Sequence, residues 1–443
     1  MNTLSMLRSG KLAGRARLDL SCGLTEFPPE IFELADTLEI LNLSGNALSA
    51  LPDNLPLLKK LRVIFCSDNL FTEVPEVLGR CVNLEMVGFK ANKITRFSGA
   101  ALPRALRWLI LTDNQLRELP VGLGQCTGLQ KLMLAGNQLQ SLPEEMAACQ
   151  KLELVRISAN RFDVLPAWLT SLPRLAWLAF AGNPFSDILE SAAAVSHKIP
   201  VVSWHTLEVH KKLGEGASGV IHQANWQQAS VTPVAVKFFK GAVTSDGLPR
   251  CEKAASLAAG LHPNLISATG RLSDHPDGAA GLVMPLIDVS FVNLADPPSL
   301  VSCTRDIYAP DIKFTLDAIL SMALGIASAV AHLHKLGILH GDLYAHNILW
   351  NGQDKCLLGD FGASSFIDAR RDGRMLERVE VRAFGCLLEE LLSRCMPPQA
   401  GAEATFGSLR ELQYRCVQIE VDARPLFFKI RDELASMRTN FFL

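Results

Sequence analysis

The sequence predicts a two-domain chain, with an N-terminal α/β solenoid of short repeats and a C-terminal α+β domain. Its 443 residues are too many for a single hydrophobic core. A period of about 23 residues runs through the first half, and a period of this length indicates a solenoid. The period ends before Trp204, after which a glycine-rich loop and an apolar strand bearing a lysine follow.

Composition narrows the classes of partner and compartment. Hydrophobic residues make up 49% of the chain but aromatic residues only 7%, as expected of a leucine-rich repeat array. The net charge of −2 gives no electrostatic reason to expect nucleic acid or an anionic membrane as partner. The 11 cysteines form no CxxC pair, which indicates reduced thiols and a cytoplasmic location. The longest uncharged apolar run, residues 318–333, is shorter than a membrane span and is expected to be a buried helix.

The repeat pattern LxxLxLxxNxLxxLP starts at Leu38 and recurs in register. Its asparagines are separated by 23, 23, 22, 23, 23 and 23 residues and are Asn46, Asn69, Asn92, Asn114, Asn137, Asn160 and Asn183. Each LxLxx segment is expected to be a short parallel strand, and each asparagine to satisfy backbone groups of the adjacent turn. The pattern resembles the leucine-rich repeats of the 23-residue type. The resemblance implies a solenoid with its caps over residues 1–190.

Strand positions that alternate with the leucines are expected to line the concave face of the solenoid. Nine of these fourteen positions carry large apolar side chains, which is unusual for a face in water. The resemblance implies that a protein partner binds there, through Phe65, Trp108, Ile110, Met133, Leu154 and Trp177. The alternative is that this face packs on the second domain of the chain or on another copy.

Residues 191–203 carry no repeat and are expected to link the solenoid to a second domain at residues 204–443. That domain opens with the sequence GEGASGVI, whose candidate nucleotide-binding residues are Gly214, Glu215, Gly216, Ala217, Ser218, Gly219 and Ile221. Glycines allow two strands to turn tightly over a nucleotide, with backbone N–H groups directed at phosphate oxygens. Taken alone, the loop also fits a hairpin that binds nothing.

A lysine inside an apolar strand supports the nucleotide interpretation. Lys237 ends the sequence VAVK, 23 residues after Gly214. A buried lysine is costly unless an opposite charge meets it, and phosphates or a carboxylate could supply that charge. Glu252, on a predicted helix followed by HPN, is the candidate carboxylate.

Two further motifs supply carboxylates. In HGDLYAHN, Asp342 and Asn347 occupy the aspartate and asparagine positions of the pattern HRDLxxxxN. Thirteen residues after Asn347, Asp360 begins the sequence DFG. Four neighbouring histidines (His332, His334, His340 and His346) could suggest zinc, but no cysteine pair completes a metal-binding spacing, so structural roles are favoured.

Together these motifs resemble those of the protein kinase fold. The resemblance covers residues 204–443 and implies a bilobal domain. It implies ATP and Mg²⁺ as cofactors, with Asp342 accepting the proton of a substrate hydroxyl and Lys237 binding phosphates. It also implies that Asn347 and Asp360 hold magnesium. The adenine would contact the remaining candidates, Ala235, Met284, Ile287 and Leu349.

The sequence departs from the kinase pattern after Asp360. Only about 20 residues separate Asp360 from Glu380, no APE motif follows, and Gly341 replaces the arginine before Asp342. We therefore expect a truncated activation segment and no control by its phosphorylation. Arg424 would normally pair with the missing APE glutamate, and Glu377 or Glu380 are its candidate partners.

Three functions fit these motifs. The first is an active protein kinase that favours serine or threonine hydroxyls as acceptors, its own included. The chain retains the residues that such an enzyme needs: Lys237, Asp342, Asn347 and Asp360. A nucleotide-binding pseudokinase scaffold would act through its repeats, although pseudokinases usually lose one of these residues. A small-molecule phosphotransferase is suggested by HGD and the short segment, but such enzymes lack the full glycine-rich loop and the VAVK strand.

Overall fold

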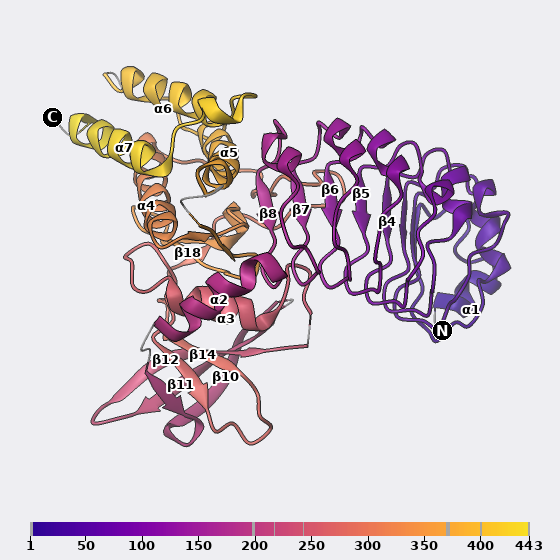
Figure 1. Ribbon diagram of the computed structural model, residues 1–443, viewed down its shortest axis with the longest axis horizontal. Helices are drawn as coiled ribbons and strands as arrows, with labels where there is room; N and C mark the ends of the chain where they lie inside the picture. Colours follow the sequence, from indigo (N-terminus) through magenta and orange to yellow (C-terminus); the bar gives the residue numbers. More distant parts are fainter. Residues whose placement is uncertain are drawn as a thin grey trace. The chain divides into compact units, whose positions relative to one another are not determined.

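The computed structural model describes residues 3–196, 200–216, 218–241, 243–368, 373–398 and 401–441. The described chain forms two compact units, 1–172 and 173–443, each with its own core (Figure 1). The predicted solenoid is the basis of the first unit. The predicted α+β domain makes up most of the second.

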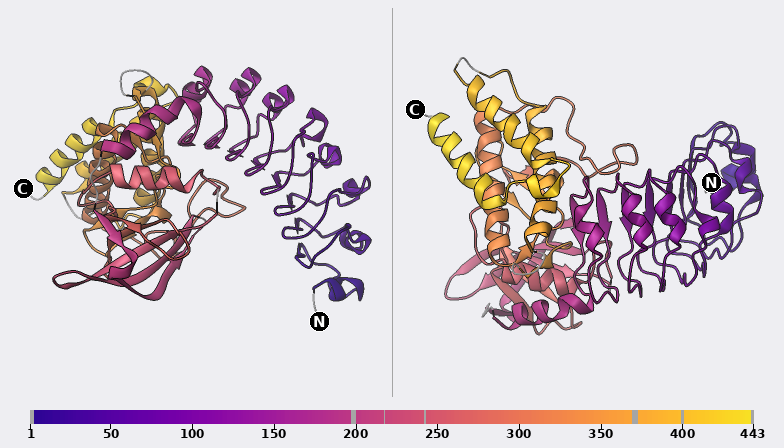
Figure 2. Two further views of the ribbon diagram at one scale, coloured as in Figure 1. Left: turned by 60° about the horizontal axis from the view of Figure 1, so that its bottom comes forward. Right: turned by 45° about the horizontal axis from the view of Figure 1, so that its top comes forward.

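The first unit begins with helix α1 (Thr3–Arg8) and continues as parallel strands that run in sequence order. The strands are β1 (Arg17–Asp19), β2 (Ile40–Asn42), β3 (Val63–Phe65), β4 (Met86–Gly88), β5 (Trp108–Ile110), β6 (Lys131–Met133) and β7 (Leu154–Arg156). Short 3₁₀ helices alternate with them: η1 (Pro29–Leu34), η2 (Leu55–Leu57), η3 (Glu76–Arg80), η4 (Gly99–Ala101), η5 (Val121–Gln125), η6 (Glu144–Ala148) and η7 (Ala167–Ser171). The strands line the inner side of the arc and the 3₁₀ helices its outer side (Figure 2).

The repeated asparagines form a hydrogen-bonded ladder, as their spacing predicted. Asn69 is typical: its Nδ2 donates to the Leu43 carbonyl of the preceding repeat at 2.9 Å, and its Oδ1 accepts from Leu48 N at 2.9 Å. The side chain thus satisfies backbone groups that are buried and lack partners within the short strands. The central residue of each strand is apolar and buried. These residues are Leu18, Leu41, Ile64, Val87, Leu109, Leu132 and Val155, and they form one continuous core.

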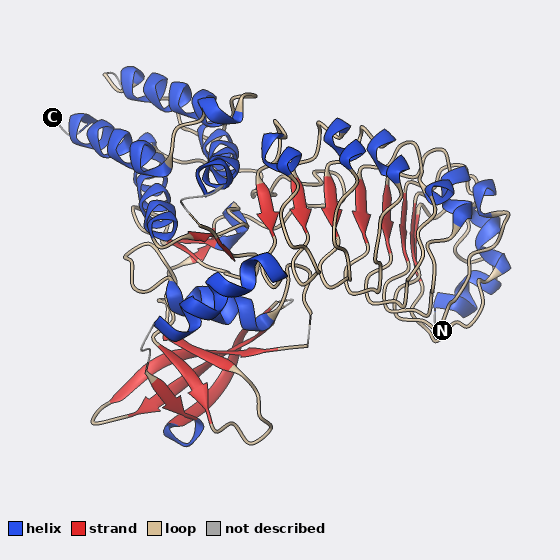
Figure 3. Ribbon diagram, in the orientation of Figure 1, coloured by secondary structure: helices blue, strands red, loops and turns tan. Residues whose placement is uncertain are grey.

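The second unit begins with the last repeat strand, β8 (Trp177–Ala179), and helix α2 (Pro184–Ser196). A six-stranded sheet follows in the order β10-β11-β12-β14-β13-β9 (Figure 3). Its strands are β9 (Val201–Ser203), β10 (Leu207–Glu215), β11 (Gly219–Gln227), β12 (Val231–Phe239), β13 (Gly270–Ser273) and β14 (Gly281–Pro285). The helical segments in this lobe are η8 (Trp204–Thr206) and α3 (Pro249–Ala258).

The rest of the second unit is mainly helical. Its helices are α4 (Leu316–Lys335), η9 (Ala345–Asn347), α5 (Gly373–Leu392), α6 (Glu403–Cys416), η10 (Val421–Ala423) and α7 (Phe427–Phe441). Two small sheets carry the catalytic motifs, β15 (Val292–Asn293) with β17 (Ile348–Trp350) and β18 (Cys356–Leu358), and β16 (Ile338–Leu339) with β19 (Ser365–Phe366). By length and composition α4 could cross a membrane, yet 78% of its most apolar 18-residue window is buried, as expected of a core helix.

The predicted linker at 191–203 is only partly correct. Helix α2 extends through Ser196, and β9 is an edge strand of the six-stranded sheet, paired in parallel with β13. Val202 of β9 is 1% exposed because it packs against Val236 and Val283. The end of the repeat pattern at Phe185 did not reveal β9, because a three-residue strand carries no local pattern that predicts pairing with the distant β13.

Candidate active site

The glycine-rich loop is a hairpin between β10 and β11. The two strands pair with Glu215 opposite Val220, and Gly216 N donates to Gly219 O at 2.9 Å. A Cβ on Gly219 would lie 2.3 Å from Phe238 O, so this close approach of β11 to β12 requires glycine. Glu215 forms ion pairs with Lys212 of the same strand and with Lys240, which directly follows β12. Ala217, the remaining predicted residue of the loop, lies outside the described residues.

Lys237 and Glu252 form a buried ion pair at the base of the loop. Lys237 projects from β12 and Glu252 from α3, and their side chains are 12% and 4% exposed. Burial raises the pKa of Glu252, the positive charge of Lys237 opposes that effect, and the nearby Asp360 carboxylate adds to it. Glu252 thus has two charged neighbours, one attractive and one repulsive. The pair leaves Lys237 fixed in position for an anionic ligand.

The catalytic-loop motif forms its own hydrogen-bonded unit. Asn347 ends η9, directly after the loop, and its Nδ2 donates to Asp342 Oδ2 at 2.8 Å and to Asp342 O at 2.9 Å. These bonds fix the orientation of the Asp342 carboxylate. Both bonds use the side-chain N–H groups of Asn347 and not its side-chain oxygen.

Asp360 adopts a left-handed conformation, with φ 56°, which is uncommon for a residue other than glycine. The turn is held because Asp360 Oδ1 accepts a hydrogen bond from Gly362 N at 3.0 Å. Directly before it, the Gly359 carbonyl lies 2.8 Å from His340 Nε2. Strained backbone at a carboxylate is frequent in functional sites.

A cavity of about 170 Å³ lies between the glycine-rich hairpin, the Lys237–Glu252 pair and Asp360. Eight predicted residues line it: Gly216, Ser218, Gly219, Ile221, Lys237, Glu252, Met284 and Asp360. Five residues that the sequence analysis did not single out also line it: Ser256, Ile266, Ala268, Leu282 and Phe361. The apolar positions after HPN and the phenylalanine of DFG were the available signals for three of these.

The other predicted site residues lie outside this cavity lining. Gly214 and Glu215 stay on β10, while Asp342 and Asn347 belong to the catalytic loop. Ala235 is buried on β12 opposite Met284, Leu349 lies on β17, and Ile287 is half-buried after β14.

Glu380 on α5 supports the catalytic loop from below. It is 3% exposed and accepts hydrogen bonds from Gly341 N at 2.6 Å and from His334 Nε2 at 2.7 Å. Burial alone would raise the pKa of Glu380, but the bond to His334 outweighs it and the pKa is lowered. Burial alone would lower the pKa of His334. The bonds to Glu377 and Glu380 outweigh burial and raise the pKa of His334 to about 9. A charged pair therefore underlies the loop.

The four neighbouring histidines all contact protein acceptors, in agreement with the structural role favoured above. The pairs are His332 with Ala259 O, His334 with Glu380, His340 with Gly359 O, and His346 with Asp306.

Neither predicted partner of Arg424 is correct. The Arg424 guanidinium donates to three backbone carbonyls, those of Gln418, Arg378 and Pro173. Glu380 instead pairs with His334. Burial lowers the pKa of Arg424 to about 10, and carbonyl oxygens fill the place of the carboxylate that the chain lacks.

The segment after Asp360 is short, as the motif spacing predicted. Residues 361–368 are mostly buried, and β19 pairs with β16 before α5 begins at Gly373. Within the described residues of this segment, no extended surface loop is left to cover the catalytic loop.

Part of the predicted partner-binding face is not accessible. Trp177 is 2% exposed because its ring stacks on Tyr344, so at this position the face packs on the second domain of the chain, the alternative given above. Met133 and Leu154 are also buried, at 9% and 3% exposed. Phe65, Trp108 and Ile110 are half-buried, and Trp108 packs edge-on against Phe65.

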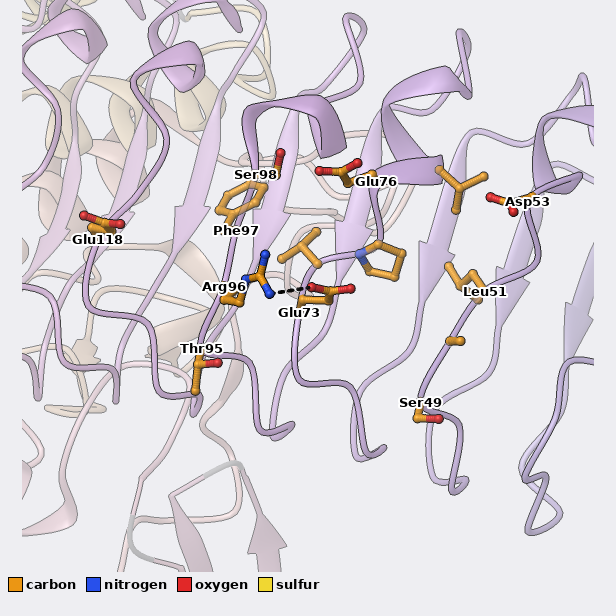
Figure 4. A pocket seen from close by; sticks show the side chains of 14 residues that line it. Ser49, Leu51, Asp53, Glu73, Glu76, Thr95, Arg96, Phe97, Ser98 and Glu118 are labelled. Carbon is orange, nitrogen blue, oxygen red and sulfur yellow. Dashed lines mark ion pairs between the residues drawn. The ribbon is translucent and has the colours of Figure 1, made fainter.

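A larger cavity, of about 670 Å³, opens on the repeat unit (Figure 4). Its carboxylates include Asp53 and Glu73, which pair with Arg80 and Arg96. All four side chains are more than half exposed, so such pairs are solvated surface features. This cavity holds no arrangement suited to acid–base or nucleophilic chemistry.

Asn347 of the catalytic loop and Asp360 of the smaller cavity fit magnesium in their chemistry. Asn347 offers a carbonyl oxygen and Asp360 a carboxylate, and magnesium prefers such hard oxygen ligands. Two protein oxygens are few, but sites that share the ion with a substrate phosphate need no more. Among the described residues no group of three or more histidine, cysteine, aspartate or glutamate side chains is arranged to hold a metal by itself.

Comparison with known proteins agrees with this geometry. Residues 207–382 match the family model described as protein tyrosine and serine/threonine kinase. A probable serine/threonine-protein kinase of Dictyostelium discoideum is 27% identical over 186 residues, which are 42% of this chain and 10% of that protein. The activated Cdc42 kinase-like protein of Drosophila melanogaster is 23% identical over 300 residues, covering 56% of this chain and 22% of its own length.

A vertebrate receptor is also similar. Ephrin type-B receptor 3 of Danio rerio is 28% identical over 165 residues, which are 37% of this chain and 30% of the receptor. The chain spans less than a third of the length of each of these relatives.

The two-lobed fold, the buried lysine–glutamate pair and the two motif aspartates define the second unit as a domain of the protein kinase class. Residues 207–382 belong to the protein tyrosine and serine/threonine kinase family. In this chain the kinase domain follows a leucine-rich-repeat solenoid of parallel strands.

Proposed function

We propose that this chain is an ATP- and magnesium-dependent protein kinase whose favoured acceptors are serine and threonine hydroxyls, its own included. The observation that carries the proposal is the pairing of Lys237 with Glu252 in the same cavity as Asp360. A buried ion pair beside a second carboxylate is costly unless a ligand uses it, which supports nucleotide binding, and the catalytic-loop carboxylate Asp342 favours transfer over binding alone.

Each motif has a distinct task in this proposal. Lys237, held by Glu252, neutralises charge on the phosphates, and the glycine-rich hairpin covers them with backbone N–H groups. Asp342, oriented by Asn347, accepts the proton of the attacking hydroxyl. The half-buried apolar residues Ile221 and Met284 contact the base.

Asn347 and Asp360 would hold magnesium, which supplies charge neutralisation at the phosphates when bound. The fixed left-handed turn at Asp360 keeps its carboxylate at the cavity. Asn347 contributes the oxygen that its bonds to Asp342 leave available.

The repeat unit is proposed to recruit a protein partner through Phe65, Trp108 and Ile110. These three half-buried apolar side chains lie on strands β3 and β5, on either side of β4, and Phe65 contacts Trp108 across it. Aromatic anchors of this kind are enriched in protein interfaces. A cytoplasmic location is part of the same proposal, because none of the 11 cysteines is paired in a disulfide.

The test is incubation of the purified chain with γ-labelled ATP, magnesium and a peptide library containing serine, threonine and tyrosine. Label mapped to serine or threonine, in the peptides or in the chain, supports the proposal. Nucleotide binding without any transfer would instead identify a pseudokinase scaffold. Label found only on added small-molecule hydroxyl compounds would identify a small-molecule phosphotransferase.

A further inference from the structure

The last repeat strand lies against the catalytic loop inside the second unit. Trp177 of β8 stacks on Tyr344, with ring centroids 4.2 Å apart and planes inclined by 6°. Its Nε1 donates to the Leu343 carbonyl at 3.0 Å. Leu343 and Tyr344 directly follow Asp342, so one tryptophan contacts the loop through both its ring and its N–H group. Both Trp177 and Tyr344 are buried, at 2% and 5% exposed.

Two neighbouring residues of the repeat extend this contact. Phe180 N donates to the hydroxyl of Ser365, on the short segment that follows Asp360, at 3.0 Å. A Cβ on Gly341 would lie 2.8 Å from Leu178 O and 2.4 Å from Ala363 O. Gly341 also has φ +74°, which favours glycine. Glycine at position 341, directly before Asp342, therefore allows strand β8 to approach the loop closely.

Helix α2, which follows the repeat, lies against the helix that carries Glu252. Glu190 of α2 is 9% exposed and accepts from Gly182 N at 2.7 Å and from the Ser186 hydroxyl at 2.7 Å. Its other oxygen lies 3.2 Å from the thiol of Cys251, which donates to it. Cys251 is adjacent to Glu252 on α3. Residues 173–196 thus contact both the catalytic loop and the helix of the ion pair.

The segment after Asp360 is short and contacts the start of the catalytic loop. Its strand β19 pairs with β16, Ser364 Oγ donates to His340 O at 3.1 Å, and α5 starts at Gly373. The terminal repeat contacts the loop beyond Asp342 and the short segment itself, with an aromatic stack, two hydrogen bonds and a close backbone approach. These contacts do not depend on added phosphate.

We propose that the terminal repeat, residues 173–196, supports the catalytic loop in place of a full-length activation segment, with Trp177 as the positioning residue for that loop. The inference rests on the proposed kinase function and adds its regulation: the terminal repeat, which is part of the second unit, holds the catalytic loop in its working arrangement. Trp177 touches neither nucleotide nor acceptor in this account. It acts through Leu343 and Tyr344 on the orientation of Asp342.

The test compares three variants of the full chain: Trp177→Ala, Trp177→Phe and Trp168→Ala. Trp168 is a matched control, because it is a buried tryptophan of the repeat unit on η7, 9% exposed, whose Nε1 donates no hydrogen bond within the described residues. Two measurements are made below the melting temperature of every variant. They are steady-state phosphorylation at varied ATP and hydrogen exchange of peptides covering residues 339–349.

Trp177→Ala is expected to lower kcat about 10- to 100-fold with KM for ATP within about twofold, since a small misplacement of a catalytic group costs rate rather than ground-state binding. Exchange at residues 339–349 should rise about tenfold. Trp177→Phe, which keeps a ring for stacking, should restore most of kcat. Trp168→Ala should change neither quantity by more than about twofold.

Wild-type kcat in folded Trp177→Ala, or unchanged exchange at residues 339–349, would overturn the inference. An equal loss in Trp168→Ala would reduce the effect to general stability and overturn it too. If Trp177→Ala does not fold, the comparison of Trp177→Phe with wild type still decides, because loss of the bond to Leu343 O should raise exchange there. A wild-type chain that transfers no phosphate refutes the proposed function, whereas the exchange comparison then still judges the support of the loop.

Discussion

Replacing Glu252 with glutamine tests the buried ion pair while keeping the shape of the side chain. The change removes the negative charge that faces Lys237, whose side chain is 12% exposed, and leaves that lysine beside Asp360. Lys237 would then be drawn toward Asp360 instead of being held at the position of the phosphates.

The magnitude follows from burial. Removing one partner of a fully buried ion pair costs about 3–5 kcal/mol. The nearby Asp360 carboxylate compensates part of the charge of Lys237, so we expect a loss of roughly 2–3 kcal/mol in transition-state stabilisation. That loss corresponds to a decrease in kcat/KM of about 30- to 150-fold.

The assay is steady-state phosphorylation at varied ATP, with thermal unfolding measured on the same samples. Glu433→Gln is the matched control, because it removes the same charge from the Arg415–Glu433 pair, whose side chains are 37% and 35% exposed. Pairs at that exposure contribute at most about 1 kcal/mol, so the control should keep its kcat/KM. A folded Glu252→Gln chain with kcat/KM within threefold of wild type would refute the reasoning about the pair.

Two further predictions concern the support of the catalytic loop. The His334 pKa is raised to about 9 from an ordinary value near 6.5, so its bond to Glu380 stabilises the fold fully below about pH 6.5 and is lost as pH rises through 9. The difference in free energy of unfolding between wild type and His334→Gln, measured by denaturant titration, should therefore shrink by up to about 3 kcal/mol between pH 6.5 and 9, and a constant difference would contradict this. Gly341→Ala should destabilise the chain by roughly 1–3 kcal/mol and lower kcat, because its Cβ would lie 2.4 Å from Ala363 O at φ +74°; a melting temperature equal to that of wild type would show that the loop can shift freely.

Local patterns in the sequence predicted much of the fold. The asparagine spacing predicted the ladder of the solenoid, because each repeat contacts mainly its neighbours and one repeat explains the rest. The pairing of Lys237 with Glu252 was also expected, since a buried lysine requires an opposite charge and the HPN sequence marks the helix that supplies it. The extent of the second domain was harder to place, because β9 joins its sheet only through long-range pairing with β13.

Contacts between distant segments could not be read from periodicity. Trp177 occupies the same strand position as Trp108, and nothing local distinguishes the buried residue from the half-buried one. Arg424 was predicted to pair with a carboxylate, but backbone carbonyls accept its hydrogen bonds instead, because the fold brings them to the guanidinium. Both cases depend on which segments meet in the second unit.

The central claim is that Asp342 is the base of a phosphoryl-transfer site. The most direct measurement is single-turnover transfer of label from γ-labelled ATP by Asp342→Asn, together with nucleotide affinity. Asp354→Asn, an exposed aspartate in the turn after β17, is the control. We expect a rate lower by about 10²- to 10⁴-fold in Asp342→Asn, with nucleotide affinity within threefold of wild type and no change in Asp354→Asn. Equal rates in wild type and Asp342→Asn would contradict it.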